Sequence, residues 1–436
     1  MDDTKLNIRV TVYLSFGFFA VSLVWSLYNS VMPLLLDSDF HYLNNFQVGA
    51  IMVIANIAAL VLEPTFGRIS DRTHTRFGRR LPYIMVGIPI AAVSLALLPR
   101  MGSLAPMLAV LILFCFVMAM WRTPVVSLMP DLTPGPLRSQ ANGIVNMLGG
   151  IGSLLAFVGG GTLLKIGVAP GARPNYQLSF LVAAVVMLLA LAVLVTKVRE
   201  PAQAFAAPVG DTRSNLNLSQ LDPAKRRSLF LLLSAIFFWF VAYNAVEVYF
   251  TKFAHLTLGV SAGNAPIILG TYAVAFLAFA VPAGMIGARV GRRNTMLVGL
   301  AGIVLCFIPM VMGTNVVMTI VCLVLGGLFW ACININSLPM VLRMGDDNMV
   351  GTFTGLYYLF SVAAAIIGPP VAGWLIDLAG KHQILFIQMT DNGNYRILFL
   401  YCAVAFLIAL VILTFVHHGE EAARAPLPEG PIQAMA

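Results

Sequence analysis

Three charged residues stand inside long apolar runs of this chain: Glu63, Arg122 and Glu247. A charged side chain held at the depth of membrane hydrocarbon costs about 2.5 to 3.5 kcal/mol, so each should face a cavity or a partner. Glu63 precedes Arg68 by five residues, which is about 7.5 Å of helix rise, and Arg122 precedes Met129 by seven. Glu63 and Arg122 therefore lie at a similar depth, and we expect them to form a buried ion pair.

Such a pair could couple proton binding to a movement of the chain. Protonation of Glu63 would release Arg122 to contact a substrate, and a membrane potential of 100 mV adds about 2.3 kcal/mol for each charge moved across it. Glu247 follows Tyr243 and Asn244 by about one helical turn, where it could bind a proton or sugar hydroxyls. The alternatives are a static structural pair for Glu63 and Arg122, and a solvated carboxylate for Glu247.

Amide and aromatic side chains recur within the same apolar runs. A sugar needs both, because amides form hydrogen bonds with its hydroxyls and aromatic rings cover its apolar C–H faces. The candidate binding residues are Trp25, Tyr28, Asn29, Asn142, Asn146, Tyr243, Asn244, Trp330, Asn334, Asn336, Tyr357 and Tyr358. The alternative for any single amide is a hydrogen bond between two helices, worth under about 1 to 2 kcal/mol.

The elements that position these residues must be membrane helices. Of 436 residues, 59% are hydrophobic and only 10% are charged, and the apolar residues come in long blocks. Spans of roughly 20 residues or more indicate an all-α membrane protein with twelve transmembrane helices. The predicted spans are 11–36, 46–69, 82–99, 104–129, 140–165, 176–198, 229–252, 264–287, 294–312, 316–341, 350–376 and 395–416.

The placement of charge predicts the topology. Most of the 26 Lys and Arg residues fall on one side of the predicted spans, which favours a multi-pass protein of the cell membrane, or of the inner membrane in a bacterium, with both termini cytoplasmic. The longest polar stretch, 199–228, is typical of a cytoplasmic linker. It divides the chain into an N-terminal six-helix bundle (1–198) and a C-terminal one (229–418), followed by a cytoplasmic tail (419–436).

The two bundles carry related sequences, which indicates a duplicated, pseudo-symmetric fold. Three segments recur in the same order at about half the chain length: "WSLYNSV" (25–31) as "WFVAYNAV" (239–246), "GRISDRTHTRFGRR" (67–80) as "GMIGARVGRR" (284–293), and "WRTPVVSLMP" (121–130) as "WACININSLPM" (330–340).

Several other classes of function lack their residues. The net charge of +8 does not predict a nucleic-acid partner, because no polar stretch is long enough to form a water-facing basic domain. The five cysteines lie in separate apolar runs and the six histidines lie in loops or the tail, so we expect no metal site and no cofactor. An enzyme would need a nucleophile and a base that converge at one depth, and a receptor would usually add a water-soluble sensing domain. Neither of these features is visible in the sequence.

The loop at 67–80, its weaker copy at 284–293 and "PDLTPGPLRSQANG" (130–143) resemble the loops of major facilitator superfamily transporters. "EPTFGRISDRTHTRFGRRLPYI" (63–84) is especially similar to the branch that holds the glycoside, pentoside and hexuronide cation symporters and the sucrose–proton symporters. The resemblance covers nearly the whole chain. It implies that two bundles rock about a midplane site, so that the site opens to each side in turn.

The resemblance also implies that the loop after the second span helps to hold an inner gate. The gate candidates are Asp71, Arg72, Arg79, Arg80, Asp131 and Arg138. Asp71 could pair with Arg138 or with other gate residues when the inner face is closed, whereas the arginines could serve topology alone. Ala288 stands where the second copy would have its aspartate, so we expect an asymmetric gate.

For the coupling ion, the resemblance favours protons. Cation symporters of this branch carry Asp-Pro where this chain has Glu63-Pro64, which implies a cation or proton role for Glu63. The second acidic residue of the sodium-using relatives corresponds to Ala59. The aspartate that plant-type sucrose symporters carry on the fourth span corresponds to Cys115, so that mechanism does not transfer.

The sequence therefore predicts a secondary active transporter that moves a glycoside, a disaccharide such as sucrose or maltose, together with a proton by alternating access. We expect the proton-coupling residues to be Glu63, Arg122 and Glu247, and the protein to act as a monomer in the bilayer. The alternatives are sodium-coupled sugar symport and proton-coupled efflux of amphiphilic compounds.

Overall fold

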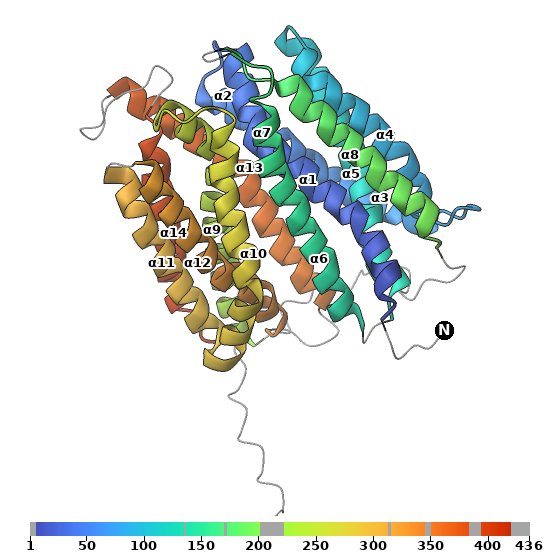
Figure 1. Cartoon of the computed structure of the whole chain (residues 1–436). Coiled ribbons are helices and arrows are strands. Elements are labelled where there is room, and N and C mark those ends of the chain that lie inside the picture. The colour runs from blue at the N-terminus through green and yellow to red at the C-terminus, as the bar shows by residue number, and fades with distance from the viewer. Residues whose placement is uncertain are drawn as a thin grey trace, which may run out of the picture.

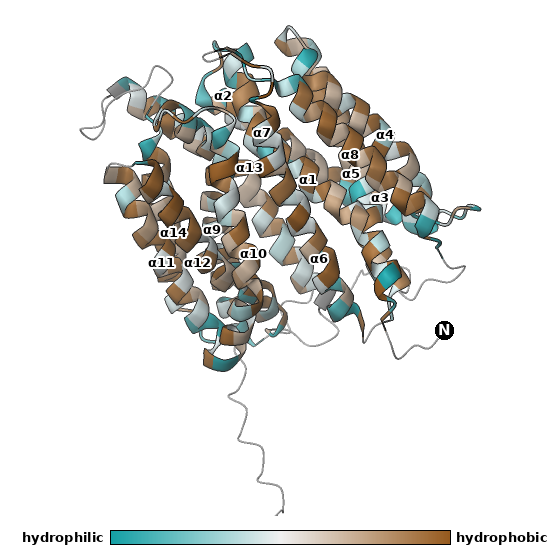
Figure 2. Cartoon of the chain, in the orientation of Figure 1, coloured by the Kyte–Doolittle hydropathy of each residue, from teal (hydrophilic) through white to brown (hydrophobic). Residues whose placement is uncertain are grey.

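The structure is a computed structural model that describes residues 6–134, 137–169, 172–200, 222–312, 315–344, 350–382 and 394–419. Within these residues the chain is helical, with one isolated bridge between Thr75 and Gly78 and no strand. Twelve helical segments are long and apolar enough to cross a membrane, which confirms the predicted number of spans. Figure 2 shows hydrophobic residues along most of their length and hydrophilic ones mainly near their ends.

Six spans form the first half of the chain. Their elements are α1 (Ile8–Asp39), α2 (Asn45–Met52) with α3 (Ile54–Arg72), α4 (Leu81–Leu97) with the short η1 (Leu98–Arg100), α5 (Leu104–Leu132), α6 (Arg138–Leu155) with η3 (Ala156–Gly160) and α7 (Gly161–Leu163), and α8 (Tyr176–Lys197). Two of these spans are interrupted: the second at Val53, and the fifth by the five-residue π-helix η3.

The other six spans are single helices. They are α9 (Pro223–Leu256), α10 (Asn264–Val290), α11 (Arg292–Met312), α12 (Val316–Leu342), α13 (Val350–His382) and α14 (Arg396–Thr414). α9 begins six residues before the predicted boundary at 229, because Asp222 caps its first turn and Pro223 suits its first position. Residues 201–221 of the predicted linker and 420–436 of the predicted tail lie outside the described residues.

The helices run side by side, with the first half of the chain beside the second (Figure 1). We call the end at which α1 begins and α14 ends the lower end, and the end at which α1 ends and α2 begins the upper end. Several helices that start at the upper end are capped by asparagine, whose side-chain oxygen accepts the free N–H of the first turn. Asn44 caps α2 with Gln47, Asn175 caps α8, and Asn315 caps α12.

The predicted repeat is visible in the packing. A β-carbon built on Gly67 of α3 would lie 3.2 Å from Thr123 of α5, and one built on Gly284 of α10 would lie 3.3 Å from Ile335 of α12. Equivalent spans thus approach each other closely at the equivalent glycine in both halves. The halves meet where α1 packs on α9, α2 on α13, and α6 on α10.

Candidate functional site

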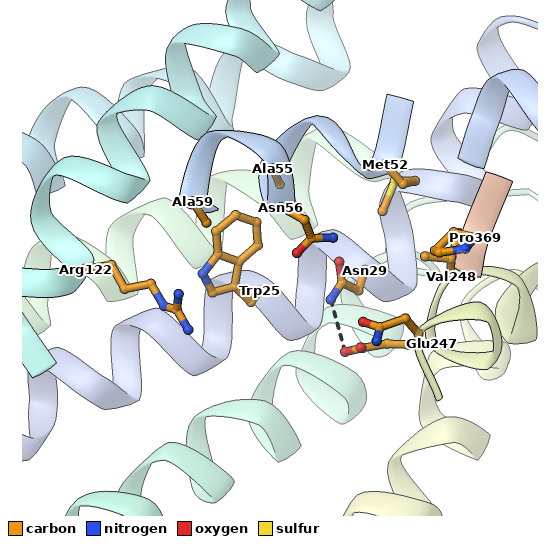
Figure 3. Close-up of a pocket in the computed structure, with 11 residues that line it drawn as sticks. Trp25, Asn29, Met52, Ala55, Asn56, Ala59, Arg122, Glu247, Val248 and Pro369 are labelled. Atoms are coloured by element: carbon orange, nitrogen blue, oxygen red, sulfur yellow. Dashed lines mark hydrogen bonds between the residues drawn. The ribbon is translucent and has the colours of Figure 1, made fainter. Parts of the chain in front are cut away.

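A cavity of about 250 Å³ lies between the two halves, midway along α1 and α9 (Figure 3). α1, α2, α3 and α5 supply its lining from the first half, and α9 and α13 supply it from the second. The lining residues are Trp25, Asn29, Met52, Ala55, Asn56, Ala59, Arg122, Asn244, Glu247, Val248 and Pro369. Polar groups from both halves therefore face one partly open cavity, and such convergent polar groups are what orient a ligand in small-molecule sites.

Glu63 of α3 and Arg122 of α5 form the ion pair that their matched depth predicts, with Nη1 of Arg122 donating to Oε1 of Glu63. Arg122 lines the cavity, and Glu63 follows the lining residue Ala59 by one turn. The two side chains are 37% and 25% exposed, so the pair is partly shielded but reachable. Nε of Arg122 is buried and has no hydrogen-bond partner among the described residues.

A second polar contact crosses from one half to the other. Nδ2 of Asn29 on α1 donates to Oε1 of Glu247 on α9 at 3.0 Å. In the view of Figure 3, Asn29 and Trp25 lie between Arg122 and Glu247. Asn244 also lines the cavity, and its Nδ2 donates to the carbonyl of Phe240 at 2.7 Å. Because a carboxamide also has an oxygen acceptor, the Asn244 side chain keeps a group for a bound ligand.

Asn56 is a cavity residue that the sequence analysis missed. Its Nδ2 lies 3.4 Å from the carbonyl of Ala365 on α13. A signal was present, because positions 56, 59 and 63 lie three and four residues apart and so share one helix face. Had that face been traced back from Glu63, it would have led to Asn56.

Of the predicted aromatic residues, Trp25 lines the cavity and the others do not. Trp25 lines the cavity and meets Tyr28 edge-on, with ring centroids 5.6 Å apart. Tyr28 is fully buried, and its hydroxyl has no hydrogen-bond partner among the described residues. Tyr243 stacks on Trp330 with centroids 4.5 Å apart and an interplanar angle of 7°. This stack packs α9 on α12, and neither ring is among the lining residues.

The other predicted binding residues lie away from the cavity lining. Asn336 is buried and donates to the carbonyls of Ala283 on α10 (3.2 Å) and Cys332 (2.9 Å), so it holds two helices together. The hydroxyl of Tyr357 lies 3.1 Å from that of Ser337. The remaining members are Asn142, Asn146 and Tyr358, which are exposed, and Asn334, which is half-buried.

Four of the six predicted gate residues, Asp71, Arg79, Arg80 and Asp131, form a compact cluster at the lower end of the first half. Arg80 is buried and donates to Asp131 through Nε (2.9 Å), to Ser70 through Nη1 (2.6 Å) and to Asp71 through Nη2. Arg79 completes the cluster with an ion pair to Asp131 at 2.8 Å. Arg79 and Arg80 thus hold α3, α4 and α5 together, besides any effect on topology.

A carboxylate from the end of the sixth span supports this cluster. Glu200 accepts hydrogen bonds from the backbone N–H groups of Arg79 (2.7 Å), Arg80 (2.9 Å) and Leu81 (2.6 Å). These groups stand at the start of α4, where the helix dipole favours a negative charge. Glu200 was not among the predicted gate residues, because nothing in its local sequence distinguishes it from a linker residue.

Arg138 and Arg72 take other positions. Asp71 pairs with Arg80, whereas Arg138 donates to the carbonyls of Pro130 and Thr133, each at 3.2 Å. Arg138 therefore closes the last turn of α5, as cations often do at helix C-termini. Arg72 is exposed.

The upper end holds charges that lie at, or one residue beyond, the ends of the predicted spans 11–36, 229–252 and 350–376. Lys252 of α9 is 1% exposed and forms an ion pair with Asp37 of α1 at 2.7 Å. Asp377 of α13 accepts hydrogen bonds from Asn45 at the start of α2. Both contacts join the first half of the chain to the second.

The described residues contain no group of three or more His, Cys, Asp or Glu side chains that could hold a metal ion. The polar groups of the cavity lining are instead three amides, one guanidinium, one carboxylate and the indole of Trp25. This set suits hydrogen bonding to a neutral polar ligand and exchange of a proton.

Comparisons with known proteins agree with this architecture. The family described as MFS/sugar transport protein matches residues 9–418. The isoprimeverose transporter of Lactiplantibacillus pentosus is 26% identical over 305 residues, which are 65% of this chain and 60% of that protein. The tetracenomycin C resistance and export protein of Streptomyces glaucescens is 28% identical over 122 residues, which are 28% of this chain and 23% of that protein.

Among solved structures, a mutant of the nucleoside transporter NupG superposes with a TM-score of 0.73 at 13% identity, covering 94% of this chain and all of that one. The likeness at this identity shows the fold. Together with twelve apolar spans and a family match over nearly its whole length, it shows that this chain is a multi-pass membrane protein belonging to the MFS/sugar transport protein family.

Proposed function

We propose that this protein transports a glycoside of disaccharide size together with a proton. The observation that carries the proposal is the cavity itself, in which Arg122 of a carboxylate–guanidinium pair shares one lining with three asparagines and Glu247. Amides and carboxylates bind hydroxyl groups, and Trp25 offers an aromatic face for the apolar side of a sugar ring. The name of the isoprimeverose transporter adds weight to a glycoside as substrate.

The coupling follows from the geometry of the pair. While Glu63 is ionised, its carboxylate holds Arg122 by a charge-assisted hydrogen bond. Protonation of Glu63 weakens that bond and turns the guanidinium toward hydroxyl oxygens of a sugar in the cavity. Sugar and proton then favour each other's binding, which is the thermodynamic requirement of symport.

Access to the cavity is proposed from the lower end, which the charge distribution assigns to the cytoplasm. Support comes from the upper end, where Lys252, Asp37, Asn45 and Asp377 join the two halves. The charged cluster around Arg80 at the lower end is formed by residues of the first half together with Glu200, and so it does not join the two halves.

We propose that the protein acts as a monomer, since residues of one chain line the whole cavity.

The test is uptake into proteoliposomes of labelled sucrose, maltose, melibiose and isoprimeverose, each with an imposed pH gradient or sodium gradient. We expect accumulation of one of these sugars under the pH gradient, and none under the sodium gradient alone. Accumulation driven only by sodium would refute proton coupling. Failure of all four sugars to enter the proteoliposomes would refute the glycoside assignment.

Efflux is the second candidate, because the short match to an export protein favours it. The cavity lining argues against it, since a site for amphiphilic compounds would be mainly apolar and aromatic, whereas this one presents three amides and two charged groups. Loading the same proteoliposomes with an amphiphilic dye distinguishes the two functions: gradient-driven dye movement without sugar uptake would favour efflux.

That the protein is not an enzyme stays a prediction.

A further inference from the structure

A groove of about 300 Å³ lies between α4 and α5, and it shares no lining residue with the cavity between the two halves. α4 packs on α5 and α8, and Figure 1 shows it at the edge of the molecule away from the second half. This α4–α5 groove is lined by Pro89, Ile90, Val93, Ser94, Leu97, Val110 and Leu113. Because both helices are membrane spans, the groove faces the hydrocarbon of the bilayer.

The α4–α5 groove is apolar and has the length of one lipid chain. Ser94 supplies the one side-chain hydroxyl of the lining, and this hydroxyl is already bonded to the carbonyl of Ile90 at 2.8 Å. From Pro89 to Leu97 the helix rises by about 12 Å. One leaflet of a bilayer has about 15 Å of hydrocarbon, so the groove spans most of the upper leaflet. An acyl chain lying along the bilayer normal therefore matches it in length and polarity.

The groove begins just above a tight contact between the two helices. A β-carbon on Gly87 of α4 would lie 2.7 Å from the β-carbon of Trp121 on α5, so no space remains between the helices at that level. Pro89 follows two residues later, and the groove starts there. Proline cannot donate a helical hydrogen bond and its ring clashes with the preceding turn, so helices bend at such positions.

A cation stands at the upper end of the groove. Residues spaced by three, four and three positions share one face of α4 and η1: Ile90, Val93, Leu97 and Arg100. η1 is a 3₁₀-helix, in which side chains three residues apart are eclipsed, so Arg100 follows Leu97 on the groove side. Arg100 is exposed and has no carboxylate partner among the described residues. The apolar stripe of α4 thus ends in an unmatched positive charge at the level of the lipid headgroups.

The start of α5 presents hydrogen-bond donors at the same end. Ser103 is the N-cap residue of α5, is exposed, and makes no side-chain capping hydrogen bond. It also precedes Pro106, Val110 and Leu113 by the spacing of three, four and three that α4 shows, so it ends the groove-facing stripe of α5. An uncapped helix start has free N–H groups and favours a negative charge. These donors add to the attraction that Arg100 has for an anion.

We propose that the α4–α5 groove binds one phospholipid of the upper leaflet, with an acyl chain along the groove and the phosphate against Arg100 and the start of α5. The two parts of the site match the two parts of the ligand, because the lining is apolar and the exposed cation is complementary to a phosphate. A chain without a phosphate would leave Arg100 unmatched, and a phosphate without a chain would leave the groove unused. The site lies outside the cavity and does not depend on the function proposed above.

The test is lipid binding to the delipidated protein in a neutral detergent, measured by native mass spectrometry. Three ligands are compared: a phosphatidylglycerol, a diacylglycerol with the same chains, and glycerol 3-phosphate, which has the phosphate without chains. We expect phosphatidylglycerol to bind about fivefold more tightly than the diacylglycerol, which is the contribution of one arginine near a membrane surface, and glycerol 3-phosphate not to bind. Equal binding of the two lipids in the parent would overturn the proposal.

Two kinds of variant separate the phosphate contact from the groove. Arg100→Gln should weaken phosphatidylglycerol about fivefold, to the level of the diacylglycerol, and leave the diacylglycerol unchanged. Val93→Trp places a large ring in the groove and should weaken both lipids at least fivefold. Val93 is 61% exposed, so the larger side chain need not disturb the packing of α4. Leu113→Trp, at a position 48% exposed, blocks the groove from α5 and decides the question should Val93→Trp fail to fold.

The matched controls change like residues outside the groove. Lys165→Gln removes another exposed upper-end cation, which bonds Asn264, and Val185→Trp enlarges a residue of α8 that is 47% exposed. Both should bind phosphatidylglycerol as the parent does. Unchanged binding in Arg100→Gln, or an equal loss in the controls, would show that lipid covers the helices without a defined site and would overturn the proposal. Because no sugar is present, a failure of sugar uptake would not affect the result.

Discussion

Replacing Glu63 by glutamine removes the titratable partner of Arg122 while keeping the shape of the side chain and one oxygen acceptor. The ion pair is intermediate in burial, with side chains 25% and 37% exposed. Exposed pairs are worth about 0.2 to 1 kcal/mol, whereas breaking a fully buried pair costs about 3 to 5 kcal/mol. We therefore expect the substitution to lower the free energy of unfolding by about 1 to 3 kcal/mol, which leaves a folded carrier to assay.

The effect on transport should be much larger than the effect on folding. One proton that moves down a gradient of one pH unit supplies about 1.4 kcal/mol, which is a tenfold concentration ratio. Parent proteoliposomes should therefore accumulate sugar about tenfold under this gradient alone, and more when an inside-negative potential adds about 2.3 kcal/mol per 100 mV. In Glu63→Gln no proton is taken up at this site, so the internal sugar concentration should only equal the external one.

The assay is uptake of labelled sugar at fixed pH gradient, with counterflow of the same sugar measured in parallel. Counterflow needs no coupling and should be partly retained in Glu63→Gln. Asp39→Asn is the control, because it breaks an ion pair with Arg173 in the same half but away from the cavity, and it should accumulate sugar normally. Tenfold accumulation by Glu63→Gln would remove Glu63 from the coupling role.

Two further predictions use pairs of like residues with different surroundings. Arg80→Ala should lower the free energy of unfolding by about 3 to 5 kcal/mol, because it leaves the buried carboxylate of Asp131 without this ion-pair partner. Arg72→Ala, at an exposed position, should change the free energy of unfolding by less than about 0.5 kcal/mol. Thermal unfolding followed by fluorescence measures both changes, and equal losses would contradict a stabilising role for the buried cluster. Asn244→Ala should weaken sugar binding about 2- to 12-fold with little change in stability, because it removes one hydrogen-bonding group from the cavity lining. Asn336→Ala should lower stability and leave sugar affinity unchanged, because Asn336 bonds α12 to α10. Equilibrium binding and thermal unfolding measure the two effects, and the reverse pattern would show that the sugar binds elsewhere.

Much of the fold could be predicted, because a membrane span is a local property of the sequence. Twenty apolar residues in a row have few other uses, and the number of spans was correct. The Glu63–Arg122 pair was predictable for a related reason, since counting residues from the loops gives depth and two charges at one depth attract each other. Neither inference requires knowing which helices meet across the two halves.

Contacts between the halves were not predictable in this way. Lys252 lies 215 positions from Asp37 and ends a predicted span, where a cation usually meets water, yet it is only 1% exposed. Asn336 lies two residues from the amide of Asn334 on α12, but its side chain contacts α10 and not the cavity. Which face of a helix meets the cavity depends on packing angles that apolar, almost unpatterned membrane helices do not encode locally.

The two halves share one helix arrangement but differ in the partners of their equivalent charged residues. Arg80 binds carboxylates, whereas Arg293 of the second copy donates to the carbonyls of Leu413 and Thr414 at the end of α14 and has no carboxylate partner among the described residues. In the proposed transport cycle, the two end states are therefore not related by the symmetry of the two halves, and we expect their free energies to differ. We therefore expect the carrier without substrate to populate mainly one orientation, and the side to which the cavity seldom opens to show an apparent affinity that is weaker by the fraction of time it is open.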